Sequence, residues 1–214
     1  MKTYSVNSIP VNKLIITGKG DDDLWSKAIV LNDFSSPWED IKETKTEFKA
    51  LWDGDHLFFC FHVMDSTIHI DNTDNSFNSI NVSDRVELFF RVNASLNPYY
   101  CLEIDPSPRI MDFKALANKK FDFNWNWPKT DLFVKSYSNR NGFSVEGKIS
   151  IASLEALNLI NDRRIIETGI FRAKYYKVKD STYEPAWMSW VNPETETPNF
   201  HTPSSFGILK LESF

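Results

Sequence analysis

Alternation of apolar and polar side chains at every second residue recurs along this chain, and it restricts the fold more than any other feature. Residues 46–52 alternate in this way, and Asp53-Gly54 follows them with the residues of a hairpin turn. Residues 57–64 then read as a return strand that is apolar at nearly every position, as in a strand covered on both faces. A two-residue period belongs to β-strands, because successive side chains point to opposite faces of a sheet.

Two later segments repeat the alternation and carry charged residues on one face. In residues 84–92 the side chains of Val86, Leu88, Phe90 and Val92 point to one side. In residues 99–105 those of Tyr100, Leu102 and Ile104 do the same. If these apolar faces share one core, Glu87 and Glu103 lie together on the opposite face. The sequence therefore predicts a carboxylate pair on neighbouring strands.

The remaining elements are less regular. Residues 65–83 are expected to form a long polar loop, and residues 111–128 an irregular segment. Residues 151–159 are predicted to form one short helix, with Ser153 as its N-cap and Glu155 in its first turn. Further strands are expected at residues 143–151, 170–178, 187–191 and 206–211.

Strand signals that recur about every 8–12 residues indicate an all-β fold. We expect an antiparallel β-sandwich of two packed sheets, of the immunoglobulin-like or jelly-roll type, with at most one or two short helices. The 17 Phe, 7 Trp and 7 Tyr can fill a sizeable core. With no internal repeat and no low-complexity linker, residues 1–214 are expected to be one domain.

Charge and cysteine usage narrow the function classes. The net charge is −5 and the basic residues are scattered, so we expect no nucleic-acid partner. No apolar run approaches about 18 residues, so no membrane span is expected. The first residues lack the apolar stretch of a signal peptide, and a periplasmic or secreted location stays open. Cys60 and Cys101 lie in apolar runs typical of buried free thiols rather than a disulfide.

Aromatic residues near the end of the chain form the first candidate site. Trp190 and Phe200 flank a loop rich in proline, asparagine and threonine, and His201 follows. Rigid rings beside polar groups suit a binding platform, although such rings also close the end of a sandwich core. Trp125 and Trp127 would face the same way at strand spacing, either as a stacking surface or as a cover for the core.

The carboxylate pair has three possible roles. Glu87 and Glu103 could act as the acid and base of a glycosidase, or accept hydrogen bonds from a ligand. They could also pair across the sheet with Arg85, Arg172 or Lys174. The chain has no Ser-His-Asp signature, no nucleophile elbow and no Gly-rich phosphate loop, so we expect no catalytic residues and no enzyme.

Residues 71–75 resemble the start of an EF-hand loop. The match fails because the sixth position is Ser76 rather than glycine and the twelfth is Val82 rather than glutamate. No cofactor is expected, and a structural calcium ion bound in another geometry stays open.

Five segments in order resemble carbohydrate-binding module family 9 and its family-9-like relatives. These are an acidic stretch followed by tryptophan, a Leu-Trp-Asp hairpin, an Asp-x-Val-Glu-x-Phe strand, a Ser-Trp pair and a closing Pro-x-x-Phe-Gly segment. They lie at residues 21–28, 48–58, 84–89, 189–190 and 200–207.

The resemblance implies a β-sandwich that binds sugars without cleaving them. In this family the sugar can lie between two aromatic rings. One of these positions matches Phe200 here, while the other falls near Asn81, which is not aromatic. Phe77 or the loop with Trp125 and Trp127 could replace the second ring. The glutamate of the family's strand corresponds to Glu87, but Glu103 stands where some members have arginine. The resemblance also allows a structural calcium ion.

We therefore expect non-catalytic binding of a saccharide that supports polysaccharide or oligosaccharide catabolism, with a glycoside hydrolase as the candidate partner. The expected ligand-binding residues are Phe200, His201, Trp190, Glu87, Glu103, Lys174, Trp125 and Trp127. Three alternatives remain: an enzyme that uses Glu87 and Glu103, a protein-interaction sandwich, and a family member whose sugar site has degenerated.

Overall fold

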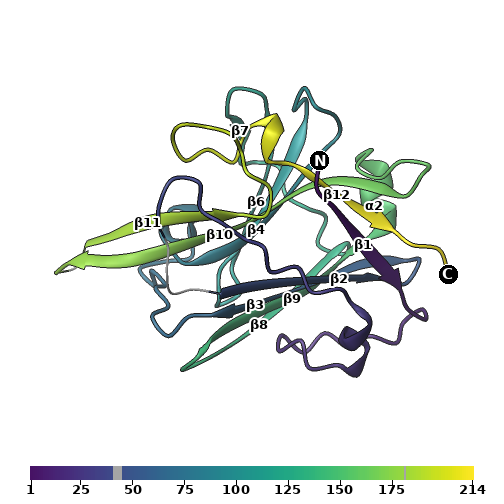
Figure 1. Cartoon of the computed structure of the whole chain (residues 1–214), viewed down its shortest axis with the longest axis horizontal. Coiled ribbons are helices and arrows are strands. Elements are labelled where there is room, and N and C mark those ends of the chain that lie inside the picture. Colours follow the sequence, from purple (N-terminus) through teal and green to yellow (C-terminus); the bar gives the residue numbers. More distant parts are fainter. Residues whose placement is uncertain (41–44, 181) are drawn as a thin grey trace.

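The computed structural model describes residues 1–40, 45–180 and 182–214, and it folds into two packed β-layers (Figure 1). The first layer contains β7 (Lys120–Asp122), β6 (Ile110–Leu116), β5 (Tyr99–Ile104), β4 (Arg85–Arg91), β10 (Ile165–Lys179) and β12 (Gly207–Leu211), in that order. Strand β11 (Thr182–Ser189) pairs with the second half of β10. The second layer contains β2 (Lys45–Trp52), β3 (His56–Met64), β9 (Gly142–Ser150) and β8 (Leu132–Asn139).

Strand β1 (Thr3–Ser8) joins the two layers. Its first residues pair with β12, and Asn7 and Ser8 pair with Leu51 and Trp52 of β2. Both pairings are parallel, whereas the other strand pairs are antiparallel. The predicted all-β sandwich is confirmed, with one continuous sheet folded over at β1.

Short helices occupy the connections between strands. These are α1 (Phe77–Asn81) and α2 (Ile151–Ala156), together with the 3₁₀ turns η1 (Asp23–Lys27) and η2 (Pro203–Ser205). No helix among the described residues is both long and apolar enough to span a membrane.

The main core lies between the layers and follows the predicted alternation. From β4 it takes Val86, Leu88 and Phe90, and from β5 Tyr100 and Leu102. These side chains are buried, since apolar surface leaves water where the two sheets meet. Residues of opposite parity on the same strands, such as Phe89 and Tyr99, belong to a separate cluster on the outer face of the first layer.

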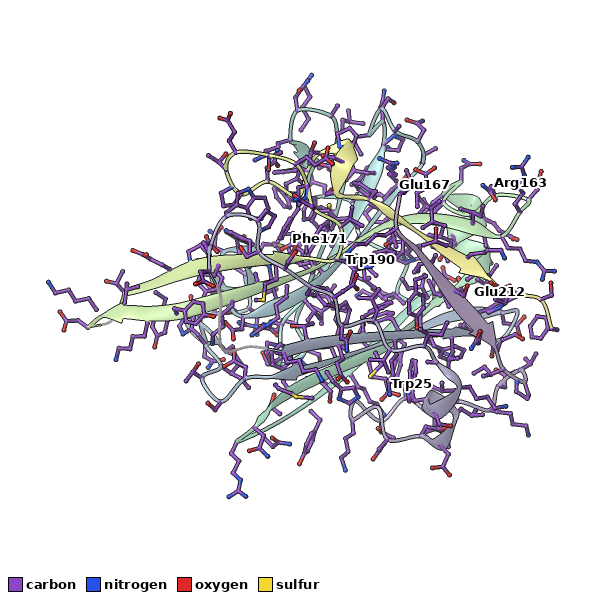
Figure 2. All side chains as sticks on the ribbon, in the orientation of Figure 1. Trp25, Arg163, Glu167, Phe171, Trp190 and Glu212 are labelled. Carbon is purple, nitrogen blue, oxygen red and sulfur yellow. The ribbon has the colours of Figure 1, made fainter. Side chains whose placement is uncertain are left out.

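Loops cover both outer faces of the sandwich. The N-terminal segment lies on the second layer, where Ile16 and Trp25 pack against Phe58 and Cys60. Figure 2 shows Trp25 on the far side of the second layer from Phe171. The segment around Phe200 covers the first layer in the same way. Covered outer faces explain why the central strands are apolar at almost every position.

Several element predictions need correction. Residues 111–128 are not irregular throughout, because they contain most of β6 and all of β7, joined by a turn in which Asn118 and Lys119 have positive φ. The expected polar loop includes α1. Helix α2 is capped by Ser150, whose side chain accepts a hydrogen bond from the Ser153 amide, so Ser153 is not the cap. No acidic residue lies in its first turn, in contrast to the prediction for Glu155.

The bounds of some strands also differ from the expectation. Strand β11 ends at Ser189 instead of beginning at Trp187, and β10 begins five residues before the predicted Ile170. Strands β1 and β8 were not predicted. Cys60 and Cys101 are free and buried, as expected.

Candidate functional site

A cavity of about 470 Å³ opens on the outer face of the first layer. Its lining residues come from four places: the strands β4, β5 and β6, the helix α1, the β6–β7 hairpin, and the segment from β11 to His201. They are Phe77, Asn78, Asn81, Arg85, Glu87, Glu103, Met111, Phe113, Lys119, Phe121, Phe123, Trp187, Pro198, Asn199, Phe200 and His201. A concave site with aromatic walls and a few polar groups is the usual form of a small-molecule site.

The carboxylate pair and one arginine form the polar floor. Glu87 and Glu103 are directly opposite each other in the β4–β5 ladder, and both side chains are buried. The Nε atom of Arg85 lies 2.6 Å from Oε2 of Glu103 and 2.9 Å from Oε1 of Glu87. Because Nε carries a single hydrogen, it bonds only Glu103. Among the described residues, Oε1 of Glu87 therefore has no hydrogen-bond donor.

Burial changes the protonation of this pair. Removal from water raises the pKa of Glu87, the neighbouring charge of Glu103 raises it further, and the Arg85 guanidinium lowers it. The pKa of Glu103 is also raised by burial, against the effect of Arg85. Two carboxylates at one site cannot both ionise easily, so the pair tends to hold a proton. The floor thus offers both an acceptor oxygen and a carboxylic acid to an occupant.

Phe200 forms one aromatic wall of the cavity. Its ring stacks on Phe171 of β10, with centroids 4.0 Å apart and planes at 13°. Trp187 of β11 meets the Phe200 ring edge-on at 5.6 Å. Behind it, the Phe200 carbonyl accepts a hydrogen bond from the Ser205 hydroxyl. The stacking on Phe171 and the hydrogen bond to the Phe200 carbonyl hold this ring in place. Figure 2 shows Phe171 within the first layer.

His201 lies in the wall as a neutral side chain. Its ring stacks near Phe89, with centroids 5.1 Å apart, and its Nδ1 lies 3.0 Å from the Tyr99 hydroxyl. Burial, together with the charges of Lys119 and Arg85, lowers the pKa of His201 to about 3. The imidazole is therefore uncharged at neutral pH, which suits it to hydrogen bonding.

A second group of rings lines the cavity from α1 and the β6–β7 hairpin. Phe77 contacts Phe123 at 5.8 Å between centroids, and Phe123 contacts Phe121 and Phe113 at 5.7 Å and 4.9 Å. Helix α1 begins at Phe77 because Ser76 caps it through the Ser79 amide. Asn81 ends the same helix, so Phe77 brings an aromatic ring to the cavity one turn before the asparagine.

The structure brings four predicted site residues to this cavity: Glu87, Glu103, Phe200 and His201. Lys174 is a correction, because it lies on the inner side of β10. Its Nζ is 2.9 Å from Asp65 and 3.3 Å from Asp84, and its side chain is almost fully buried. Arg172 pairs with the same two aspartates and not with Glu87 or Glu103.

The three other predicted tryptophans also lie away from the cavity. Trp127 is buried in the main core, and its Nε1 donates to the Ser153 hydroxyl. Trp125 packs on Tyr100 at the edge of that core, with centroids 4.8 Å apart. Trp190 is buried between the layers beside Gly207. All three tryptophans thus cover or fill the core, which was the alternative to a binding platform.

Residues of the β6–β7 hairpin and Trp187 were missed as site residues. Phe113 follows the two-residue alternation of β6, which could have placed it on the same face as Glu103. Phe121 and Phe123 also alternate, but no glycine marks their turn. Arg85 was considered only as a partner for the glutamates, and the structure makes it part of the floor.

The segment that resembles an EF-hand loop uses its oxygens within the protein. The Asp71 carboxylate accepts hydrogen bonds from the Thr73 amide and hydroxyl. The carbonyls of Asp71 and Asp74 accept from the Arg109 guanidinium, at 2.8 Å and 2.6 Å. Within the described residues no cluster of three or more His, Cys, Asp or Glu side chains could hold a metal ion.

Comparisons with known proteins show the family and the fold of this chain. A family model described as "Carbohydrate family 9 binding domain-like" matches residues 16–213. A crystal structure from Bacteroides uniformis, provisionally described as carbohydrate-binding, is similar with a TM-score of 0.74 and 17% identity over 99% of both chains. No curated protein matches the chain.

A carbohydrate-binding module family 9 from Caldicellulosiruptor kristjanssonii is similar in two structures. In complex with cellotriose it has a TM-score of 0.68 and 18% identity, over 100% of this chain and 95% of that one. In complex with glucose the TM-score is 0.66 and the identity 18%, over 100% of this chain and 97% of that one. At these identities the similarity establishes a common fold.

Proposed function

Because this chain belongs to the carbohydrate family 9 binding domain-like family, we propose that it binds a saccharide without cleaving it, in the cavity between Phe200 and Phe77. The observation that carries this proposal is the combination of aromatic walls with a buried carboxylate floor. A pyranose has apolar C–H faces and a rim of hydroxyls, which match rings and carboxylates respectively. The sugar complexes of the similar structures support the same interpretation.

Binding without hydrolysis fits the position of Arg85. A glycosidase needs its two carboxyl groups on either side of the scissile bond. Here the Arg85 Nε lies within 2.9 Å of both Glu87 and Glu103, so the guanidinium occupies the gap between them. The proposal therefore predicts no release of the phenol from aryl glycosides, even at high protein concentration.

In this proposal the protein acts as a sugar-binding module in polysaccharide or oligosaccharide catabolism, beside a glycoside hydrolase. The partner enzyme would be one whose substrate contains the sugar that this cavity binds. Faster hydrolysis of that polysaccharide by a candidate hydrolase in the presence of this protein would support the pairing. Equal rates with and without it would count against the pairing alone.

The test of binding is a titration with mono- and oligosaccharides followed by tryptophan fluorescence, because Trp187 lines the cavity. The measurement is repeated with calcium and with a chelator, since the family resemblance allows a structural calcium ion. A saturable change with one sugar class is expected, and Phe77→Ala should weaken it by about tenfold through loss of a stacking surface. Phe133→Ala is the matched control, because Phe133 is an exposed ring on β8 away from the cavity.

Phe200→Ala should weaken binding as well, but this ring is also packed against Phe171 and could affect folding. Phe77, which is only partly buried, is therefore the cleaner variant. Unchanged affinity in Phe77→Ala and Glu103→Gln, on folded protein, would remove this cavity from the proposal.

A further inference from the structure

When both carboxylates of the cavity floor are ionised, one guanidinium faces two negative charges, and from this we propose that the cavity selects amino sugars, whose ring carries an ammonium group, over neutral and acidic sugars. The inference rests on the proposed function, because it concerns the ligand of the same site. Its structural basis is that two buried carboxylates, Glu87 and Glu103, share one guanidinium.

Arg85 forms an ion pair with both carboxylates but donates a hydrogen bond to only one of them. The single Nε hydrogen goes to Glu103 at 2.6 Å. Nη1 donates to the Asn81 carbonyl at 2.8 Å and lies 3.4 Å from the Ser83 carbonyl. The guanidinium also lies over the Trp187 ring, at 5.3 Å from its centroid. These contacts fix its orientation, so it cannot turn a second donor toward Glu87.

Glu87 is left with a buried oxygen that nothing bonds. Its side chain is about 2% exposed, and Oε1 has no hydrogen-bond donor among the described residues. A buried carboxylate oxygen without a hydrogen-bond donor is costly, and the cost is relieved either by a proton or by a second cation. An occupant that supplies a cation from the cavity side would complete the pairing of both glutamates.

The other lining residues do not provide that cation. His201 is neutral, and its Nδ1 is already engaged with the Tyr99 hydroxyl. Lys119 lines the cavity from the β6–β7 turn, but it is exposed, so water and salt screen its charge. Arg85 is thus the only buried cation among the described residues that line the cavity.

The ammonium group of an amino sugar meets these requirements. It has three donors and a positive charge on a ring that the aromatic walls can hold. A neutral hydroxyl in the same place donates one hydrogen bond and brings no charge, so the pair keeps its proton. The carboxylate of an acidic sugar would be repelled by the pair, and charge repulsion of this kind is a strong source of specificity.

The test is a competition titration with glucosamine, glucose, N-acetylglucosamine and glucuronic acid at about pH 6, where a sugar amine is mostly protonated. The wild-type protein should bind glucosamine at least about tenfold more tightly than glucose. N-acetylglucosamine carries an uncharged amide in place of the ammonium group, so it should not bind more tightly than glucose. Glucuronic acid should bind most weakly of the four.

Glu87→Gln tests the assignment to this residue. The substitution keeps the size of the side chain and removes its charge, so the ratio of glucosamine to glucose affinity should fall toward one. Higher salt should lower the same ratio in the wild-type protein. Tyr137→Ala, at an exposed ring outside the cavity, should leave the ratio unchanged.

The outcomes separate the two proposals. Glucose binding that equals or exceeds glucosamine binding overturns the amino-sugar selectivity and leaves the sugar-binding function intact. A preference that survives in Glu87→Gln also overturns it. Absence of binding to all sugars of a wider panel, by folded protein, overturns the proposed function together with the selectivity.

Discussion

His201 shows how burial at one residue fixes both a charge and a pH dependence. The folded protein lowers the pKa of this imidazole from 6.5 to about 3. The unfolded chain takes up a proton near pH 6.5, so between these two values it binds more protons than the folded state. The contribution to stability is thus complete above pH 6.5 and is lost as the pH falls toward 3.

Within this range we expect the free energy of unfolding to fall, through His201 alone, by up to about 1.4 kcal/mol for each unit by which the pH decreases. Urea unfolding at about pH 7 and about pH 5 measures the effect. His201→Gln removes the titration, and its stability should change less between the two pH values than that of the wild-type protein. Equal changes in both proteins would contradict the assignment.

Glu87 acts in the opposite direction. Burial and the charge of Glu103 raise its pKa, so its protonated form is favoured in the folded state. Stability from this group is complete below the ordinary value of 4.5 and is lost as the pH rises through the folded-state pKa. The unbalanced carboxylate is therefore a cost at alkaline pH.

Glu87→Gln should raise the free energy of unfolding by about 1–2 kcal/mol at about pH 8, because it removes a buried charge that lacks its own partner. The same variant should bind sugar less well. A gain in the free energy of unfolding together with a loss of sugar affinity would show that Glu87 serves binding at a cost to stability. Urea unfolding of both proteins at about pH 5 and about pH 8 provides the comparison. A variant that is destabilised at both pH values would show that Glu87 stabilises the fold.

At the scale of single residues, alternation alone predicted the Glu87–Glu103 pair. It could not show that Lys174 points between the layers, because the parity of β10 relative to the core depends on which sheet covers it. Trp127 illustrates the same limit. A large ring at strand spacing suits a platform or a core, and only its packing against β4, β5 and α2 places it inside.

The loop before α1 is held by one arginine. Arg109 donates from Nη2 to the Asp71 carbonyl at 2.8 Å, from Nη1 to the Asp74 carbonyl at 2.6 Å, and from Nε to the Asp105 carboxylate at 2.7 Å. The guanidinium supplies the positive charge among these oxygens. Because the loop leads into α1, Arg109 helps to position Phe77 at the cavity.

Arg109→Gln should loosen this loop and weaken sugar binding by about three- to tenfold, since binding would then have to order the loop. Isothermal titration of both proteins with the same sugar measures the change. Arg163→Gln is the matched control, because Arg163 is exposed, lies between α2 and β10 (Figure 2) and does not line the cavity. Equal affinity in Arg109→Gln would leave α1 positioned by Ser76 and Ser79 alone.

At the scale of elements, the residues of the turn decided which of two hairpins was predicted. The Asp53-Gly54 hairpin was found because glycine accepts the φ of +94° that the turn uses. The β6–β7 turn instead uses Asn118 and Lys119, with φ of 62° and 55°. Without glycine in its turn, this hairpin carried no recognisable signal. The phenylalanines that it brings to one cavity wall were therefore missed as well.

The N-terminal segment depends on a single buried carboxylate. Glu146 of β9 accepts hydrogen bonds from the amides of Thr17 and Gly18 and from the Trp25 indole, at 2.9, 2.7 and 2.7 Å. Backbone donors of this kind stabilise an ionised carboxylate. The segment covers the outer face of the second layer through these bonds.

Glu146→Gln should lower the free energy of unfolding by about 2–4 kcal/mol, because the amide nitrogen would face donors that the carboxylate now satisfies. Urea unfolding gives the value, and sugar affinity should remain close to wild type, since the segment lies on the other layer from the cavity. Glu155→Gln, at an exposed glutamate of α2, is the control. A small change would mean that apolar contacts alone hold the segment.

At the scale of the whole molecule, the sandwich was predictable and its closure was not. The alternating strands and their turns specified two antiparallel layers. Strand β1 pairs with residues near both position 51 and position 208, and no local pattern announces partners so far apart. The joint matters for function, because β12, which β1 holds, is the neighbour of β10 in the layer that carries the cavity.

Val6 of β1 lies at this joint between the layers. Val6 is fully buried in the main core and lies in the strand that connects both layers. Val6→Ala should lower the free energy of unfolding by about 2 kcal/mol through lost burial and a residual cavity. Val11→Ala is the matched control, since Val11 is 47% exposed.

If the layers unfold as one unit, fluorescence of the tryptophans and loss of β-structure in circular dichroism should share a single transition, which Val6→Ala shifts as a whole. Two separate transitions would show that the layers are stable independently and that β1 only tethers them.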